Sequence, residues 1–293
     1  MIIIKLQGGL GNQMFQYAIA RILGEIRDEE VLLDITSFED NVKKPGYTPR
    51  NFELNIFNNS YKIADRKAVN RFKKINVINR LKQKLGFSYP QTYVETSFRF
   101  NEELFSIEND IYLVGYFQSY KYLKNHEAFT RQLYSFQTNS LSELNQNLLV
   151  KLKTLKTVSI HIRRGDFVND KLTQAYHGIC NLEYYIEAIE YICSKHKNLT
   201  MVFFSDDMQW VRESFNNFDY PKIFVDFNSR KNNWVDMLLM SKCSHNIIAN
   251  SSFSWWGAWL NTNPKKTVVA PKKWFTNEDI DTSTLLPKEW KKM

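Results

Sequence analysis

The sequence has few cysteines and no long apolar run, and both shortages restrict the class of protein. Cys180, Cys193 and Cys243 are the only cysteines among 293 residues. Their number is odd and their spacing is not that of metal ligands, so we expect reduced, mostly buried thiols. No apolar run reaches the roughly 18 residues of a membrane span. A strand pattern begins at Met1 and leaves no room for a signal peptide. We therefore expect a cytoplasmic protein without disulfides.

Acidic residues are outnumbered by basic ones, and the net charge is +8. Part of the excess lies between Lys62 and Lys84, where Asp65 is the only acid. A solvated helix face is our first interpretation of this segment, and attraction to an anionic membrane surface or a lipid diphosphate is the second. Nucleic-acid binding ranks last, because no nucleic-acid motif accompanies the charge.

Strand and helix patterns alternate along the second half of the chain. The expected strands are 157–163, 200–205, 222–226, 245–249 and 267–270. The expected helices between them lie near 182–196, 207–216, 232–243 and 252–261. This alternation predicts a parallel, doubly wound α/β sheet. The length suits two domains of roughly 150 residues, and we place them at 1–150 and 151–293.

The most informative segment reads Ser-Ile-His-Ile-Arg-Arg-Gly-Asp and ends at Asp166. Its β-branched residues predict a buried strand that delivers His161, Arg163 and Arg164 at its carboxyl end. Ligands of open α/β sheets bind at that end of the strands. Guanidinium groups match phosphate oxygens, and the glycine permits a tight turn. The segment therefore indicates a diphosphate site, although an isolated Arg-Arg pair is more often a solvated strand end.

A second segment places Ser251 and Ser252 at a strand-to-helix turn. Hydroxyls and free N–H groups at a helix start make an anion site, and an ordinary helix cap is the alternative. The helix then carries three tryptophans on one face, Trp255, Trp256 and Trp259. We expect these tryptophans to pack in the core rather than to form a sugar platform.

A glycine-rich loop from Gly8 to Gln13 separates the first expected strand from a helix expected over 14–26. The loop is similar to a dinucleotide fingerprint, but Met14 stands where the third glycine should be. Asp34 ends the next strand, so a nicotinamide-dependent oxidoreductase remains an alternative. Asn12 and Gln13 place amides at the helix start, which suits recognition of hydroxyls or phosphate.

Together these segments resemble the α1,2-fucosyltransferases of glycosyltransferase family 11. The motifs that carry the resemblance are Gly8 to Tyr17, His161 to Asp166, Phe204 to Asp207, and Trp234 to Ser241 running on to Asn250–Trp256. They span the chain from residue 1 to about residue 275. The resemblance implies a GT-B-like fold, with two Rossmann-type, doubly wound domains facing a cleft. It also implies metal-independent, inverting transfer of fucose from GDP-fucose.

The resemblance assigns roles around the phosphates of the donor. Arg163 would hold the β-phosphate and neutralise the departing GDP, while Arg164 would brace the loop. Ser251 and Ser252 would bind the phosphates. Asn12 would reach the donor from the N-terminal, acceptor-side domain.

Further roles concern the nucleotide, in the C-terminal domain that would bind GDP-fucose. His161 and Asp236 would contact the guanine and ribose. Asp206 and Asp207 would lie near the nucleotide, and a helix cap with a first-turn acid is equally expected for this pair.

The acceptor hydroxyl needs a base, for which Asp166 is the first candidate and Asp170 and His177 are runners-up. Neighbouring arginines would lower the pKa of Asp166, which makes it a weak base and a good structural partner for Arg164, so the structural and catalytic roles are equally expected. We expect no metal, because the one Asp-x-Asp spacing, at Asp279–Asp281, lies beyond the last expected strand.

The resemblance also implies the acceptor, a terminal β-galactoside that receives fucose on its 2-hydroxyl. It would be an oligosaccharide or a lipid-linked glycan of bacterial O-antigen synthesis, and peripheral contact with the inner membrane stays open. The alternatives are another fucose linkage, the oxidoreductase, or a non-catalytic carbohydrate-binding module.

Overall fold

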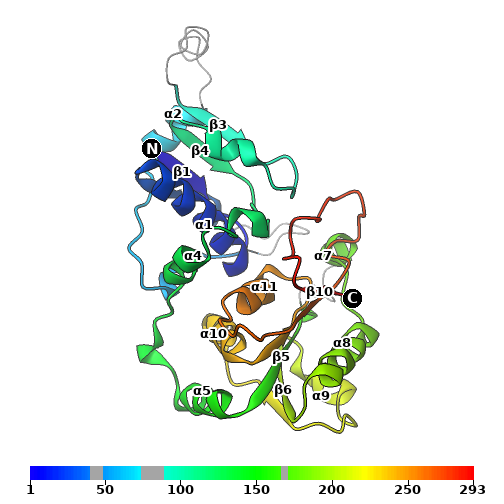
Figure 1. The fold of residues 1–293 in the computed structure, drawn as a ribbon. Coiled ribbons are helices and arrows are strands. Elements are labelled where there is room, and N and C mark those ends of the chain that lie inside the picture. The colour runs from blue at the N-terminus through cyan, green and yellow to red at the C-terminus, as the bar shows by residue number, and fades with distance from the viewer. Residues whose placement is uncertain (40–48, 74–88, 166–170) are drawn as a thin grey trace. The chain divides into compact units, whose positions relative to one another are not determined.

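The computed structural model describes residues 1–39, 49–73, 89–165 and 171–293, which form two compact units (Figure 1). Among these residues, the first unit extends to Ser135 and includes Asp281–Leu285. The second unit contains Phe136–Ile280 and Leu286–Met293. The two units thus divide upstream of residue 150, between Ser135 and Phe136.

A four-stranded parallel sheet forms the centre of the first unit, in the order β2-β1-β4-β3. Its strands are β1 (Ile2–Lys5), β2 (Val31–Asp34), β3 (Gln91–Val94) and β4 (Ile111–Val114). Its helices are α1 (Leu10–Arg27), α2 (Arg66–Lys73) and α4 (Glu127–Leu133). The isoleucines of β1 are fully buried because β1 lies between two neighbouring strands. β3 lies at the edge of the sheet, where alternate residues are accessible.

Helix α1 starts earlier than the glycine pattern indicated. It begins at Leu10, with Gly9 as the residue before its first turn. Most of the expected Gly8–Gln13 loop is therefore helical. Gly8 has a φ of 79°, a left-handed conformation that favours glycine.

A six-stranded parallel sheet forms the second unit, in the order β10-β9-β8-β5-β6-β7. Its strands are β5 (Lys156–Ile162), β6 (Leu199–Ser205), β7 (Lys222–Val225), β8 (His245–Ile247), β9 (Val268–Ala270) and β10 (Lys291–Lys292). The prediction of a parallel α/β sheet is confirmed, and β10 is an addition. Its two exposed residues carry no apolar pattern from which a strand could be predicted.

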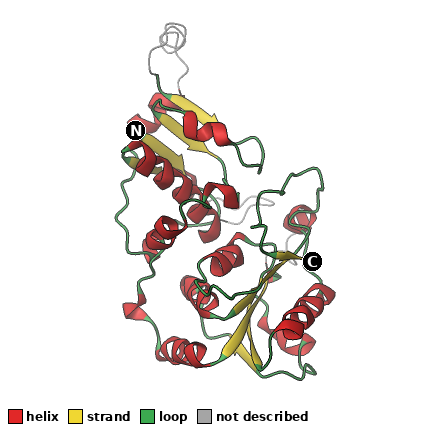
Figure 2. Cartoon of the chain, in the orientation of Figure 1, coloured by secondary structure: helices red, strands yellow, loops and turns green. Residues whose placement is uncertain are grey.

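Helices cover both faces of this sheet (Figures 1 and 2). They are α5 (Glu143–Thr154), α7 (Lys171–His177), α8 (Leu182–Lys195), α9 (Met208–Ser214), α10 (Trp234–Lys242) and α11 (Ser252–Trp259). α8 and α9 lie on one face, and α10 packs beside α11 on the other. Trp255 and Trp256 are fully buried and Trp259 nearly so, which confirms their packing role.

Two expectations drawn from composition can be compared with the described residues. No helix among them is long and apolar enough to cross a lipid bilayer. The three cysteines are thiols in the described structure; Cys243 is buried, whereas Cys180 and Cys193 are only partly buried.

Candidate functional site

Three polar segments meet at the carboxyl edge of the C-terminal sheet. Because β8, β5 and β6 are parallel neighbours, the residues that follow them lie at the same edge. In the register of β5 with β6, Ile162 is paired with Ser205. The arginines that follow Ile162 are consequently brought beside the aspartates that follow Ser205.

Arg163 forms an ion pair with Asp206 at this edge. The Arg163 Nη1 to Asp206 Oδ2 distance is 2.9 Å, and each side chain is about one-quarter exposed. Burial acts to raise the pKa of Asp206, but the charge of Arg163 and the backbone N–H groups of Arg164 and Gly165 outweigh it and hold this pKa below its usual value. A Cβ at Gly165 would lie 2.9 Å from Asp206 Oδ2, so glycine is needed for this close approach. The carboxylate therefore fixes both the guanidinium group and the turn.

Arg164 is held separately from Arg163. Its Nε donates to Asp207 Oδ2 at 3.2 Å, and its guanidinium lies 4.1 Å from the ring centroid of Trp210. Its backbone N–H donates to Asp206 Oδ1 at 2.8 Å. Asp207 also caps α9, since its side chain accepts from the N–H of Trp210. Asp207 thus has the structural role expected of a helix cap, and its contact with a donor remains a prediction.

His161 is a buried polar residue at this edge. It is 6% exposed, and its Nδ1 has no hydrogen-bond partner within the described part of the chain. The ring lies 5.6 Å from that of Phe253 at the start of α11. Burial lowers the pKa of His161 to about 4, with Arg163 acting in the same direction and Asp206 opposing it. The imidazole is neutral at neutral pH, and its buried nitrogen is suited to bond a polar ligand.

Ser251 and Ser252 begin α11 beside the same edge. Ser251 caps the helix, since its hydroxyl accepts from the N–H of Phe253 at 3.3 Å. Both serines are partly exposed. Asn250 anchors the turn, because its Nδ2 donates to the carbonyl oxygen of His177 at 2.7 Å. The sequence reasoning missed this anchor, which joins the end of α7 to the start of α11.

Asp236 lies in the first turn of α10 and belongs to a small amide network. Its Oδ1 accepts from Asn228 Nδ2 at 2.7 Å, and Asn228 is in turn bonded to Asn145 of α5. Burial raises the pKa of Asp236 to about 7, although the bond from Asn228 acts against it. The role expected toward guanine and ribose remains a prediction.

Of the three candidates for the base, His177 lies among the described residues. Asp166 and Asp170 lie outside the described residues. His177 ends α7 and packs against Tyr176 and Phe275, with ring centroids 4.8 and 5.6 Å away. Burial and the nearby charge of Arg163 lower the pKa of His177.

The N-terminal unit has a different polar arrangement. Asn12 is partly exposed, and its Oδ1 accepts from Gln118 Nε2 at 2.7 Å. Gln13 is fully buried; it donates to the carbonyl oxygens of Gly8 and Asn51 and accepts from the N–H of Glu53. The expectation that both amides suit ligand recognition is therefore wrong for Gln13, whose amide holds the backbone.

Asp34 does not have the environment of a ribose-binding carboxylate. It is fully buried, accepts from the hydroxyl of Tyr112 at 2.6 Å and accepts from the N–H of Thr36 at 3.0 Å. A carboxylate committed to the core in this way is not presented to a cofactor. Asp34 therefore gives no support to the alternative of a nicotinamide-dependent oxidoreductase.

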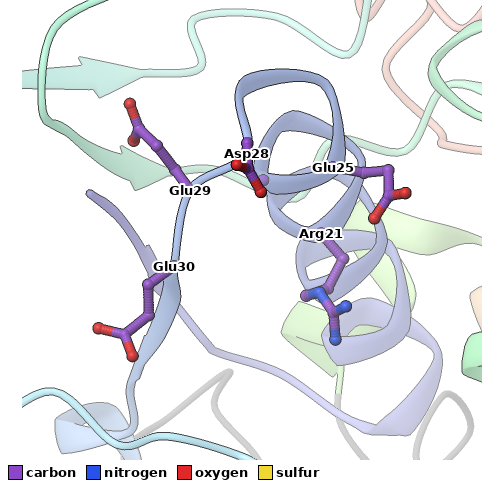
Figure 3. A pocket seen from close by; sticks show the side chains of 6 residues that line it. Arg21, Glu25, Asp28, Glu29 and Glu30 are labelled. Carbon is purple, nitrogen blue, oxygen red and sulfur yellow. The ribbon is translucent and has the colours of Figure 1, made fainter.

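The pocket in Figure 3 lies at the C-terminal end of α1 and the approach to β2. Its walls are strongly polar and consist of Arg21, Gly24, Glu25, Asp28, Glu29 and Glu30. Because β2 begins just after Glu30, the pocket lies at the amino edge of the sheet. Ligands of such sheets bind at the opposite edge, so we do not assign a substrate to it.

Known proteins resemble the chain over its whole length. The model of "Glycosyl transferase family 11" matches residues 1–293. The O-antigen biosynthesis glycosyltransferase WbnK of Escherichia coli is 36% identical and covers 96% of this chain and 97% of its own. An alpha-1,2-colitosyltransferase of Escherichia coli is 30% identical over 99% of this chain and 98% of its own.

Two more distant likenesses add detail. Galactoside alpha-(1,2)-fucosyltransferase 1 of Lagothrix lagotricha is 29% identical over 104 residues, which are 35% of this chain and 28% of that protein. The crystal structure of POFUT1 in complex with GDP-fucose superposes with a TM-score of 0.50 at 10% identity, covering 92% of this chain and 97% of the other. At that identity the likeness concerns the fold alone. Together with the two parallel sheets, it confirms the predicted GT-B-type fold.

Proposed function

The chain belongs to glycosyl transferase family 11, and we propose that it is an inverting α1,2-fucosyltransferase. It would move L-fucose from GDP-β-L-fucose to the 2-hydroxyl of a terminal β-galactoside. The relatives support a place in O-antigen synthesis, since a 36% identical protein is an O-antigen biosynthesis glycosyltransferase. The α1,2 linkage is supported by the names of the other two relatives.

The observation that carries the proposal is the buried His161, whose Nδ1 has no hydrogen-bond partner among the described residues, next to the Arg163 ion pair. A buried polar atom without a partner is costly, so this edge of the sheet is incomplete within the described chain. A nucleoside diphosphate can supply the partner that Nδ1 lacks among the described residues, and it can also contact Arg163. Its sugar or base can bond Nδ1, and its phosphates can share the guanidinium of Arg163 with Asp206.

The proposed reaction is a single displacement at C1 of fucose. A lone pair of the acceptor 2-oxygen forms the new C1–O bond, while the bond from C1 to the diphosphate breaks and its electron pair leaves with GDP. Arg163, the serine hydroxyls at 251 and 252, and the N-terminal end of α11 are suited to stabilise the negative charge that develops. Donors of this kind typically contribute about 10²- to 10³-fold in rate.

The acceptor proton must move to a base or to the departing phosphate. Asp166 remains our first candidate, and His177 is the alternative among the described residues. The lowered pKa of His177 keeps its imidazole neutral at neutral pH, which is the form that accepts a proton. No metal is expected in this scheme, because arginine and helix N–H groups neutralise the diphosphate.

A second donor is favoured by one comparison. The 30% identical alpha-1,2-colitosyltransferase covers nearly the whole chain, whereas the fucosyltransferase relative covers only 35% of it. Colitose transfer to the same hydroxyl is therefore our second candidate, and both donors belong in the test.

The test measures GDP release with EDTA present, using GDP-fucose or GDP-colitose and a panel that includes lactose and N-acetyllactosamine. The variant Arg163→Ala is compared with Arg131→Ala, which removes an arginine from a helical ion pair on α4. We expect acceptor-dependent release that falls at least about 10²-fold in Arg163→Ala alone. Failure to bind GDP, or full turnover in Arg163→Ala, would refute the proposal. Loss of turnover on adding EDTA would refute its metal independence.

The acceptor would be a free oligosaccharide or a lipid-linked glycan, and the enzyme would work in the cytoplasm. The described part of the basic segment includes α2, whose Arg66, Lys67 and Arg71 are exposed. Arg66 and Arg71 pair with Glu39 and Asp110, respectively, which supports the solvated-face interpretation. Co-sedimentation with anionic vesicles tests peripheral membrane contact.

A further inference from the structure

Two loops lie together at the carboxyl edge of the N-terminal sheet. One follows β3 and carries Phe98, and the other follows β4 and carries Tyr116. Because β3 and β4 are parallel neighbours, both loops leave the sheet at the same edge. This is the edge at which open α/β sheets bind ligands.

The loops bring two aromatic rings side by side. The ring centroids of Phe98 and Tyr116 are 6.3 Å apart and their planes differ by only 9°. The two rings therefore lie close together with nearly parallel planes. Both residues are partly exposed. The pair therefore offers parallel apolar surface of the kind that recognises a flat ligand.

The turn that carries Tyr116 is held in a strained conformation. Phe117 has a φ of 54°, which is unusual for a bulky residue. The carboxylate of Glu95 accepts from the N–H of Tyr116 at 2.6 Å and from that of Phe117 at 3.0 Å. Gln16 Nε2 donates to the carbonyl oxygen of Gly115 at 3.0 Å. Strain of this kind persists only where the surroundings enforce it, and it is concentrated at functional sites.

A returning segment ties the two loops together. Thr284 lies in Asp281–Leu285, which belongs to the N-terminal unit although it is near the end of the chain. Its Oγ1 accepts from the N–H of Phe100 at 3.0 Å. Its carbonyl oxygen accepts from the hydroxyl of Ser119 and the N–H of Tyr120, each at 2.9 Å. Thr284 therefore bonds both the loop of Phe98 and the loop of Tyr116.

The first turn of α1 supplies polar groups to the same loop. Gln118, two residues beyond Tyr116, donates to Asn12 at 2.7 Å, and Asn12 is partly exposed. A parallel aromatic pair with amides nearby suits a sugar ring, which has an apolar C–H face and a rim of hydroxyls. A galactoside has such a face on the side opposite its axial hydroxyl.

We propose that Phe98 and Tyr116 form the platform on which the acceptor β-galactoside stacks, with Thr284 as the positioning residue that joins its two loops. This inference rests on the proposed function, because it names where that reaction's acceptor binds. It concerns the N-terminal unit alone and assigns residues that the nucleotide site does not use.

The test separates acceptor binding from donor chemistry. Binding of lactose and N-acetyllactosamine is measured by saturation-transfer NMR without donor, and initial rates are measured at saturating GDP-fucose. For Tyr116→Ala we expect roughly a tenfold rise in acceptor KM, corresponding to the loss of one aromatic contact. Tyr116→Phe should stay within about twofold, because the phenyl ring keeps the stacking surface. The KM for GDP-fucose and the Kd for GDP should not change.

Additional variants test the platform should Tyr116→Ala fail to fold, and they test the role of Thr284. Phe98→Leu keeps an apolar side chain but removes the ring, and it should also raise the acceptor KM. Thr284→Val should raise that KM with little change in kcat, and Thr284→Ser should restore it by keeping the hydroxyl. Tyr220→Ala, which removes a partly exposed tyrosine from the C-terminal unit, is the matched control.

The outcomes distinguish the two proposals. An unchanged acceptor KM in Tyr116→Ala, with the wild-type protein active, overturns the platform and leaves the transferase. Galactoside binding that depends on Tyr116, in a protein that releases no GDP, keeps the platform and overturns the transferase. Absence of galactoside binding and of galactoside-dependent turnover in the wild-type protein overturns the platform.

Discussion

Replacing His161 with leucine should make the free protein more stable and its nucleotide binding weaker. The His161 side chain is 6% exposed, and its Nδ1 has no partner among the described residues. An unsatisfied buried group of this kind costs about 1–3 kcal/mol. Leucine is close to histidine in volume and removes the polar atoms. After allowing about 1 kcal/mol for imperfect packing, we expect a net gain of about 1 kcal/mol.

The matched variant is His161→Asn, whose amide lies near the position of Nδ1. It should keep the bond to the ligand and also keep the unsatisfied group in the free protein. For a unit of this size, 1 kcal/mol corresponds to roughly 2–4 °C in Tm. Loss of one hydrogen bond to GDP should raise Kd about tenfold. We therefore expect His161→Leu to be more stable than the wild type and His161→Asn. We also expect it to bind GDP more weakly than either of them.

The pH dependence gives an independent check. Burial lowers the pKa of His161 from 6.5 in the unfolded chain to about 4 in the fold. The unfolded chain then binds more protons between these values, so the wild-type protein loses stability as pH falls from about 6.5 to about 4. The leucine variant lacks this titration. Its advantage in free energy of unfolding should grow by up to about 3 kcal/mol over that interval.

Chemical unfolding at several pH values and calorimetric titration with GDP would measure these quantities. The reasoning is refuted if His161→Leu is less stable than the wild type at pH 7.5 while binding GDP equally well. That result would mean that the histidine serves packing and that Nδ1 does not face the ligand.

Two further predictions concern residues outside the nucleotide edge. Tyr112→Phe removes the 2.6 Å bond to the buried Asp34 and should lower the free energy of unfolding by about 1–3 kcal/mol, measured by urea denaturation; an effect on nucleotide affinity without a loss of stability would instead favour the cofactor interpretation of Asp34. Trp255→Ala removes a fully buried side chain that stacks on that of Trp259, with the ring centroids 5.1 Å apart. It should lower the free energy of unfolding by about 3–5 kcal/mol. Intact stability in that variant, combined with weaker glycan binding, would contradict the core role of the tryptophans.

Several elements of the second unit could be predicted because their signals are local. The strand that became β5 is rich in β-branched residues and the one that became β6 is nearly all apolar, and both are almost wholly buried because helices cover both faces of the sheet. β3 was missed because it is an edge strand of four residues with alternating exposure, directly after a proline. Helix α1 begins at Leu10, four residues before the expected start at Met14. Gly9 and Gly11 suggested a loop, but Gly9 is the residue before the first turn and Gly11 lies within that turn.

The sequence indicated candidate site residues along the chain but not how they pair with one another. The motif around His161 indicated anion binding from residue types alone. The partners of its arginines, Asp206 and Asp207, lie about forty residues away. The local sequence does not show that Arg163 pairs with Asp206 and Arg164 with Asp207, because these ion pairs follow from the register of β5 with β6.

The sequence by itself determined the family, the alternating architecture of the second unit and the segment that carries the arginines. These follow from residue type and from periodicity, which local sterics and burial impose on each segment. Only the tertiary structure decided which polar groups are committed to the core, as Asp34 and Gln13 are. It also decided that His161 Nδ1 has no hydrogen-bond partner in the part of the chain that the structure describes. It also decided that Thr284 joins the loops of Phe98 and Tyr116. Such contacts connect residues far apart in the chain, so they arise from strand register and chain return rather than from any local pattern.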